Sequence, residues 1–191
     1  MGAEAIIDIV YGRLNPSGKL SVSIPWCVGQ VPISYWDVKT GHIFTEDNSE
    51  NRFTSRYMDI PNTPLYPFGY GLSYTHFQYD NMVLSSNVLK KGEKLTVSVI
   101  VTNKGNYDGC EVVQLYLHDI YADVVCPVKE LKNFKRIFLK KGESREVRFV
   151  ITEEDLKFYN SNLQYIYETG DFEVMVGTNS RDAVSYTHLT L

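Results

Sequence analysis

Several features that would assign a function are missing from this 191-residue sequence. No apolar run approaches the roughly 20 residues that a membrane-spanning helix needs, and the first residues lack the basic stretch that opens a secretory signal. The formal net charge of −4 gives no reason to expect nucleic acid or an anionic membrane as a partner. We therefore expect neither partner. The compartment stays open between periplasmic or secreted and cytoplasmic in a bacterium.

Metal-binding and redox motifs are also missing. The cysteines match no zinc or redox spacing, and their odd number favours unpaired buried thiols: Cys27, Cys110 and Cys126. The histidines are scattered, with no i, i+4 pair and no cysteine at ligand spacing: His42, His76, His118 and His188. No G-x-S-x-G or phosphate-loop motif occurs. We therefore expect no metal and no cofactor.

What the sequence does hold is a series of short alternating segments. Aromatic residues make up 13% of the chain, which favours strands, because aromatic and β-branched side chains suit a pleated, half-buried surface. Glycine-containing turns such as 90–93 and 140–143 separate these segments. One strand is expected from Phe77, and others at residues 82–84, 95–101, 112–117, 131–138, 146–151 and 171–177. The spacing predicts a mainly β fold, a sandwich of the immunoglobulin or fibronectin type III kind. One short helical turn is expected where Thr152 precedes acidic residues.

The first 74 residues follow a different pattern. Residues 3–10 are mostly apolar and lead to Gly12, which suits a helix C-cap. Residues 20–24 then alternate as a short strand that Pro25 ends. A helix with no visible beginning that feeds a strand is typical of the last unit of an α/β domain, so we expect Met1 to be an internal residue or an artefactual start. Residues 26–67, with the polar run from Thr45 to Asn51, are expected to be irregular and to bridge two domains.

One loop in this irregular stretch combines arginine and aromatic side chains. Between Arg52 and Tyr57, two arginines stand beside two aromatic residues, the side-chain types that commonly line sugar sites. The alternative is that both arginines form ion pairs at a domain interface or face solvent. The acidic cluster from Glu153 to Asp155 suits a helix N-terminus. We therefore assign no residue as catalytic, cofactor-binding or metal-binding.

Several motifs, in order, resemble glycoside hydrolase family 3. Residues 5–20, AIIDIVYGRLNPSGKL, are similar to the closing segment of that family's α/β sandwich domain, and residues 28–32 to the stretch that follows it. The run YPFGYGLSY at 66–74 is similar to its most recognisable C-terminal motif. Residues 101–105, 109–116 and 127–132 resemble the core of its fibronectin type III-like domain. The sequence departs from the family pattern at Trp26, Cys27, Cys126 and Asn133.

The resemblance implies the C-terminal part of a retaining β-glycosidase of the β-glucosidase type, acting on a β-linked glucoside or oligosaccharide through catalytic domains that this chain lacks. In the family, the aspartate nucleophile and the acid/base precede the segment that corresponds to Met1. We therefore expect this chain alone to be inactive and to serve as a scaffold. The alternative is a free-standing fibronectin type III-like carbohydrate-binding or adhesion module. The oligomeric state stays open.

Four segments are expected. Residues 1–25 are the remnant of an α/β sandwich domain, residues 26–74 an irregular linker or interface segment, and residues 75–183 the fibronectin type III-like β-sandwich. Residues 184–191 stand where a last alternating strand is expected, but they resemble a translated sequencing-library adaptor. We therefore expect this tail to be non-native and the last strand to be missing.

Overall fold

The computed structural model describes residues 2–38, 41–42 and 51–190, without the side chains of residues 184–188. In the described residues of the first part, the helical elements are α1 (Gly2–Val10) and the short 3-10 helix η1 (Val28–Gln30). The second part holds the strands and one 3-10 turn: β1 (Phe77–Leu84), β2 (Leu95–Asn103), β3 (Gly109–Asp119), β4 (Glu130–Leu139), β5 (Ser144–Ile151), η3 (Glu153–Leu156), β6 (Phe158–Tyr159), β7 (Tyr165–Ile166), β8 (Asp171–Gly177) and β9 (Ala183–Thr190).

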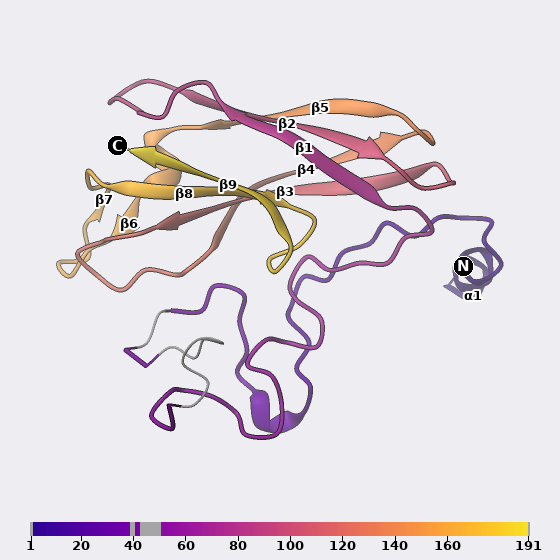
Figure 1. Cartoon of the computed structure of the whole chain (residues 1–191), viewed down its shortest axis with the longest axis horizontal. Helices are drawn as coiled ribbons and strands as arrows, with labels where there is room; N and C mark the ends of the chain where they lie inside the picture. The colour runs from indigo at the N-terminus through magenta and orange to yellow at the C-terminus, as the bar shows by residue number, and fades with distance from the viewer. Residues whose placement is uncertain (1, 39–40, 43–50, 191) are drawn as a thin grey trace.

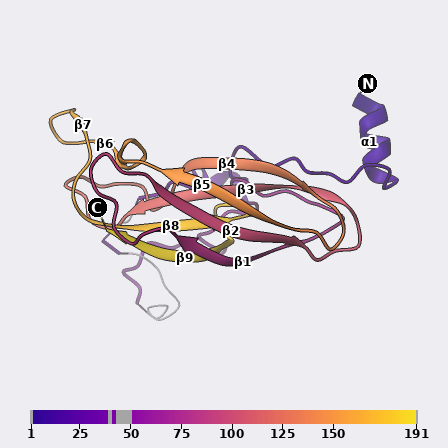
Figure 2. The same ribbon diagram turned by 90° about the horizontal axis from the view of Figure 1, so that it is seen from above.

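Two antiparallel sheets form a sandwich, as the alternating pattern predicted. One sheet has the strand order β1-β2-β5 and the other β4-β3-β8-β9, while β6 and β7 make a small separate hairpin. Figures 1 and 2 show the two sheets stacked, with the hairpin at one end of the sandwich and α1 projecting beyond the other. The mainly β fold class is therefore confirmed. Among the described residues, no helix is long and apolar enough to span a membrane.

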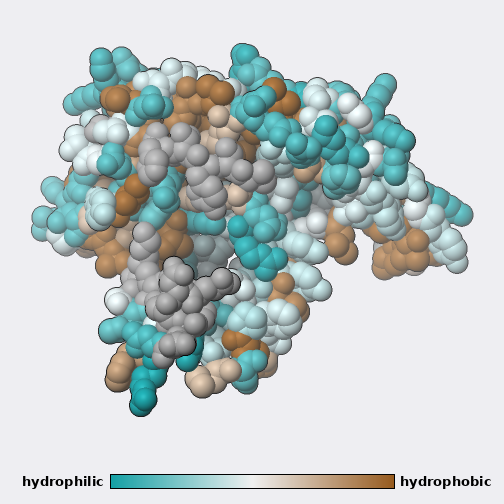
Figure 3. All heavy atoms as spheres, in the orientation of Figure 1, coloured by the Kyte–Doolittle hydropathy of each residue, from teal (hydrophilic) through white to brown (hydrophobic). Residues whose placement is uncertain are grey.

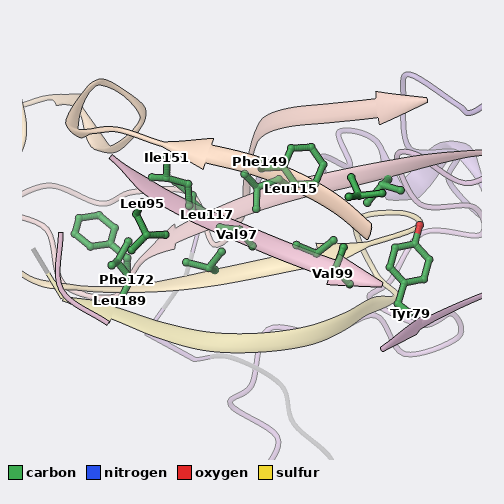
Figure 4. Packing of buried hydrophobic residues seen from close by; sticks show 14 of the residues in the cluster. Tyr79, Leu95, Val97, Val99, Leu115, Leu117, Phe149, Ile151, Phe172 and Leu189 are labelled. Carbon is green, nitrogen blue, oxygen red and sulfur yellow. The ribbon is translucent and has the colours of Figure 1, made fainter. Parts of the chain in front are cut away.

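The core lies between the sheets and comes from alternate positions of their strands. On β2, residues Leu95, Val97, Val99 and Val101 all point inward and are buried. Figure 4 shows Leu95, Val97 and Val99 between the two sheets, with Tyr79 at one end of the cluster and Phe172 and Leu189 at the other. The period of two in the sequence is thus the period of burial.

Local signals in the sequence also formed as expected. Gly12 ends α1 with φ +72°, while Gly92 and Gly142 close the two lysine-containing turns with φ +78° and +75°. Thr152 and Asp155 form a capping box at the start of η3. These features depend on neighbours a few residues away, so the sequence alone was sufficient to predict them.

The prediction of a strand at residues 20–24 is wrong. In the structure this stretch runs beside residues 66–70, but it makes only the isolated bridge between Ile24 and Tyr66 and two hydrogen bonds near Leu20. A strand needs a continuous partner ladder, and the neighbouring segment meets this one at two places only. Apart from η1, residues 26–38 and 51–74 are irregular, as predicted. Most of the polar run from Thr45 to Asn51 lies outside the described residues.

The expectation that the last strand is missing is also wrong. Residues 183–190 form β9, which pairs with β8 from Asp171 to Gly177. Leu189 enters the core and is fully buried. A strand of almost any sequence can satisfy backbone hydrogen bonds at a sheet edge, so the pairing does not depend on where these residues come from. That the tail is non-native stays a prediction.

Candidate functional site

A cleft of about 550 Å³ lies in the irregular segment below the four-stranded sheet. Its lining comes from two stretches of chain that are distant in sequence: Gln30, Pro32, Ile33, Ser34, Trp36, Asp37 and Val38 from one, and Ser55, Arg56, Tyr57 and Asn62 from the other. Trp36 is 53% exposed and Tyr57 40% exposed, so both rings are accessible. The described lining therefore combines aromatic surface with the guanidinium of Arg56 and the carboxylate of Asp37.

Polar side chains hold the two walls of the cleft together. The Gln30 amide is buried; its oxygen accepts from the Trp26 backbone N–H at 2.8 Å, and its nitrogen donates to the carbonyls of Pro61 and Thr63 at 2.9 and 3.2 Å. Asn62 fastens the second wall, because its oxygen accepts from the Tyr57 backbone N–H at 3.0 Å. A buried amide with all these partners satisfied rigidifies irregular chain.

The loop from Arg52 to Tyr57 contributes only part of its length to the cleft. Ser55, Arg56 and Tyr57 line it, whereas Arg52 and Phe53 do not. Trp36 and Asp37 also line the cleft and were not predicted from the sequence, although a tryptophan beside an acid in an irregular stretch is a usable signal. That both arginines form ion pairs at a domain interface stays an open alternative.

The carboxylates of the described residues do not form a hydrolytic pair in this cleft. Glycosidases use two carboxyl groups across the scissile bond, and Asp37 is the only acidic residue in the described lining. Asp119, which the sequence left without a partner, accepts the Tyr121 backbone N–H at 3.2 Å, and its pKa is raised mainly by burial. Glu153 and Asp155 lie in η3, the structural role expected for them.

No cysteine and no histidine belongs to the described lining of the cleft. Within the residues that the structure describes, no three His, Cys, Asp or Glu side chains are grouped to hold a metal ion. The three cysteines are unpaired, but the prediction that they are buried is wrong, because Cys27 is exposed and Cys110 and Cys126 are half-buried. His118 Nδ1 lies 2.8 Å from Glu173 Oε2. The side chain of His188 lies outside the described part.

The NPSGK motif fastens the first part of the chain to the sandwich. Asn15 donates to the carbonyl of Asp108 at 2.9 Å, and Arg136 donates to the hydroxyl of Ser17 at 3.1 Å. Lys19 Nζ lies 3.3 Å from Glu111 Oε2. These hydrogen bonds join residues 93 and 119 positions apart in sequence, so this segment packs against the strands of the sandwich.

Glu111 is a buried carboxylate at the end of the core. Its carboxylate accepts the Tyr79 hydroxyl at 2.9 Å and pairs with Lys19. Burial raises the pKa of Glu111 above its ordinary value, while Lys19 and the hydrogen bonds partly oppose that shift. The pKa of Tyr79 is raised too, chiefly by burial. Lys19 therefore compensates a charge that the core would otherwise leave unpaired.

An apolar groove of about 750 Å³ lies between α1 and the NPSGK motif (residues 15–19). Its lining is Ile9, Pro16, Ser17, Gly18, Lys19, Leu20, Ile24, Tyr66, Tyr70, Gly71 and Leu72. No residue of α1 is buried. Figure 3 shows apolar atoms gathered at the end of the molecule where α1 lies. In this chain, the helix therefore shows its apolar side to solvent.

Comparisons with known proteins agree with this architecture. The model of the fibronectin type III-like domain matches residues 111–180, and the model of the glycosyl hydrolase family 3 C-terminal domain matches residues 1–74. A periplasmic β-glucosidase of Salmonella typhimurium is 47% identical over 179 residues, which are 94% of this chain and 23% of that protein. A putative β-xylosidase of Formosa agariphila is 40% identical over 185 residues, 95% of this chain and 22% of that protein.

A solved structure is similar in three dimensions as well. The crystal structure of a β-glucosidase from Listeria innocua in complex with glucose superposes with a TM-score of 0.91 at 43% identity, over 96% of this chain and 25% of that chain. The fold and the matched segments thus define a fibronectin type III-like sandwich joined to a glycosyl hydrolase segment. The chain belongs to glycoside hydrolase family 3 and corresponds to the C-terminal region of its members. It spans about a quarter of the length of these relatives.

Proposed function

We propose that this chain is the C-terminal part of a retaining β-glycosidase of the β-glucosidase type, which hydrolyses O-glycosidic bonds in β-linked glucosides or oligosaccharides. The observation that carries the proposal is the 43% identity and TM-score of 0.91, over nearly the whole chain, to a β-glucosidase solved with glucose. The catalytic carboxylates belong to other domains of such an enzyme, and the present residues act as a scaffold. The described cleft supports this division, because Asp37 has no second carboxylate across from it.

The cleft is proposed to contact the sugar chain of the substrate. Sugar-binding sites combine apolar surface with a few polar groups that fix orientation, and Trp36, Arg56 and Tyr57 supply both. The titration of the chain with cellobiose, followed by tryptophan fluorescence, tests this role. Tyr57→Ala is expected to weaken the response, whereas Tyr159→Ala, an exposed tyrosine on β6 outside the cleft, should not. Equal responses of both variants would refute a role for the cleft.

Assays of an aryl β-glucoside test the catalytic part of the proposal. The purified 191-residue chain is expected to show no turnover above the buffer blank. Turnover that Asp37→Asn abolishes would overturn the proposal, since a residue of this chain would then be catalytic. The continuous genomic frame that includes these codons, expressed as one protein, is expected to encode a barrel domain and to hydrolyse the glucoside.

A free-standing carbohydrate-binding or adhesion module is the weaker alternative. Such a module would begin near Tyr74, but Asn15, Lys19 and Gly69 all bind residues of the sandwich across that point. A module cut at Tyr74 would lose these partners and uncover buried polar groups. The contacts thus favour a chain in which both parts fold together.

A further inference from the structure

The outer face of β3 is buried, which is unusual for a strand of a sandwich. Successive side chains of a strand point to opposite faces. Leu115 and Leu117 enter the core, so Gln114 and Tyr116 point away from it. Gln114 is nevertheless 3% exposed and Tyr116 0% exposed. The irregular segment before the sandwich therefore covers these two residues, and Figure 1 shows that segment below the sheet containing β3.

Gln114 and Tyr116 form one hydrogen-bonded network with this covering segment. The Tyr116 hydroxyl donates to Gln114 Oε1 at 2.5 Å. Gln114 Nε2 donates to the carbonyl of Thr178 at 2.6 Å and to that of Gly69 at 3.3 Å. Gly69 has φ +79°, and a Cβ there would lie 2.2 Å from Gln114 Oε1. The amide thus fills the space beside a glycine that no larger residue could replace without movement.

Tyr35 connects Tyr116 to the wall of the cleft through contacts between aromatic rings. Its ring stacks on Phe68 with centroids 4.2 Å apart and meets the Tyr116 ring edge-on at 6.1 Å. Tyr35 lies between Ser34 and Trp36, which both line the cleft. Two residues later, the carbonyl of Asp37 accepts the Val128 N–H at 2.8 Å. The wall from Pro32 to Val38 is therefore supported by the sandwich at two points.

We propose that Tyr116 and Gln114 are positioning residues, through which the sandwich domain sets the place of Trp36 and of the cleft wall. This inference rests on the proposed sugar-binding role of the cleft. It assigns the sandwich a specific task, because an irregular wall has no ladder of its own to hold it and takes its place from the sheet beneath. If the network only added stability, removal of any other buried tyrosine hydroxyl of the sandwich would disturb the cleft wall as much as removal of the Tyr116 hydroxyl.

Tyr79 supplies the matched control for this alternative. Like Tyr116, it is a buried tyrosine whose hydroxyl donates to a side-chain oxygen, but it lies at the Glu111 end of the core and outside the cleft lining. Tyr116→Phe and Tyr79→Phe each remove one hydroxyl and keep the ring. Both are made in the 191-residue chain with Trp26→Phe, which leaves Trp36 as the single tryptophan.

The first measurement needs no sugar. In Tyr116→Phe, the rate of hydrogen exchange of the Val128 amide is expected to rise about fivefold, the factor that corresponds to the loss of one neutral hydrogen bond. The emission maximum of Trp36 is expected to shift as well. Tyr79→Phe should leave both readouts unchanged while lowering the melting temperature. Unchanged readouts in Tyr116→Phe, or equal changes in both variants, would overturn the positioning role.

The second measurement uses cellobiose and separates the two proposals. Tyr116→Phe is expected to weaken binding by about fivefold, and Tyr79→Phe to leave it unaltered. If the reference chain itself binds no cellobiose, the sugar role of the cleft fails, whereas the sugar-free measurement still decides whether the network positions Trp36. The double variant Gln114→Met with Tyr116→Phe should bind cellobiose no more weakly than Tyr116→Phe alone, because the two residues act as one unit. Strictly additive losses would contradict that coupling.

Discussion

The buried pair of Lys19 and Glu111 gives the sharpest prediction. The side chain of Lys19 is 15% exposed and that of Glu111 4% exposed, so water compensates neither charge well. In Lys19→Met the Glu111 carboxylate keeps only the Tyr79 hydroxyl and its backbone partner. Removing one member of a buried ion pair typically costs 3–5 kcal/mol. Because Lys19 retains some solvent contact, we expect a loss of about 3 kcal/mol in the free energy of unfolding at pH 7.

The loss should depend on pH in a definite direction. The pKa of Glu111 is already raised from its ordinary value of 4.5, mainly by burial, and Lys19 is the largest influence that opposes the rise. Without Lys19 the folded-state pKa rises further, so the native protein binds this proton more tightly than the unfolded chain does. That contribution to stability is fully present below pH 4.5 and is lost as pH rises through the folded-state pKa. Lys19→Met should therefore be least harmful near pH 4 and most harmful at pH 7.

Urea unfolding at both pH values measures the effect. Far-UV circular dichroism follows the sandwich, and tryptophan fluorescence follows Trp26 and Trp36 in the segment before it; coincident transitions would show one cooperative unit. Arg148→Met, which breaks an exposed pair with Glu146, is the control and should leave the free energy of unfolding almost unchanged, because solvent screens an exposed ion pair.

A double variant sharpens the test. Replacing both Lys19 and Glu111 with apolar residues, in Lys19→Met with Glu111→Leu, should recover most of the lost stability, because no unpaired charge remains. If Lys19→Met lowers the free energy of unfolding by the same amount at pH 4 and pH 7, the reasoning from the buried carboxylate is refuted. A double variant as unstable as the single one would refute it equally.

Three further predictions concern other parts of the chain. Gly69→Ala should cost at least about 2 kcal/mol in urea unfolding because of its clash with Gln114, whereas Gly92→Ala, at a similar φ in open space, should cost about 1 kcal/mol; equal losses would contradict the clash. Leu189→Ala should cost about 3 kcal/mol, since the side chain is fully buried in the core; an unchanged midpoint would show that β9 does not complete the sandwich. Backbone amides of α1 should exchange hydrogen almost as fast as in an unfolded peptide, because the nine-residue helix buries no side chain, and strong protection would contradict this.

The origin of the tail is tested on DNA rather than on protein. A genomic frame that continues through the codons of residues 184–191 would refute the prediction that they are non-native. The structure places most of them in β9, and backbone pairing at a sheet edge accepts many sequences. The pairing therefore carries no information about the origin of these residues.

Part of the fold was determined by the sequence alone. The alternation in residues 95–101 predicted a half-buried strand, and β2 has that pattern of burial. Gly12 and the capping box at Thr152 marked their helical elements correctly. These features depend on the chemistry of adjacent residues, and so does the order of the motifs that resembled glycoside hydrolase family 3.

The tertiary structure decided what covers the strands and what forms the cleft. Alternation places Gln114 and Tyr116 on the outward face of β3 and so predicts exposed side chains, but residues about 45 to 80 positions earlier in the sequence bury them. The strand expected at residues 20–24 failed for the related reason that its neighbour in space supplies no continuous ladder. Trp36 and Tyr57 line one cleft because Gln30 joins two distant stretches of irregular chain, while Asn62 holds Tyr57 within the second stretch. Local periodicity fixes which face of a strand a residue occupies, whereas contacts between distant segments decide whether that face meets water.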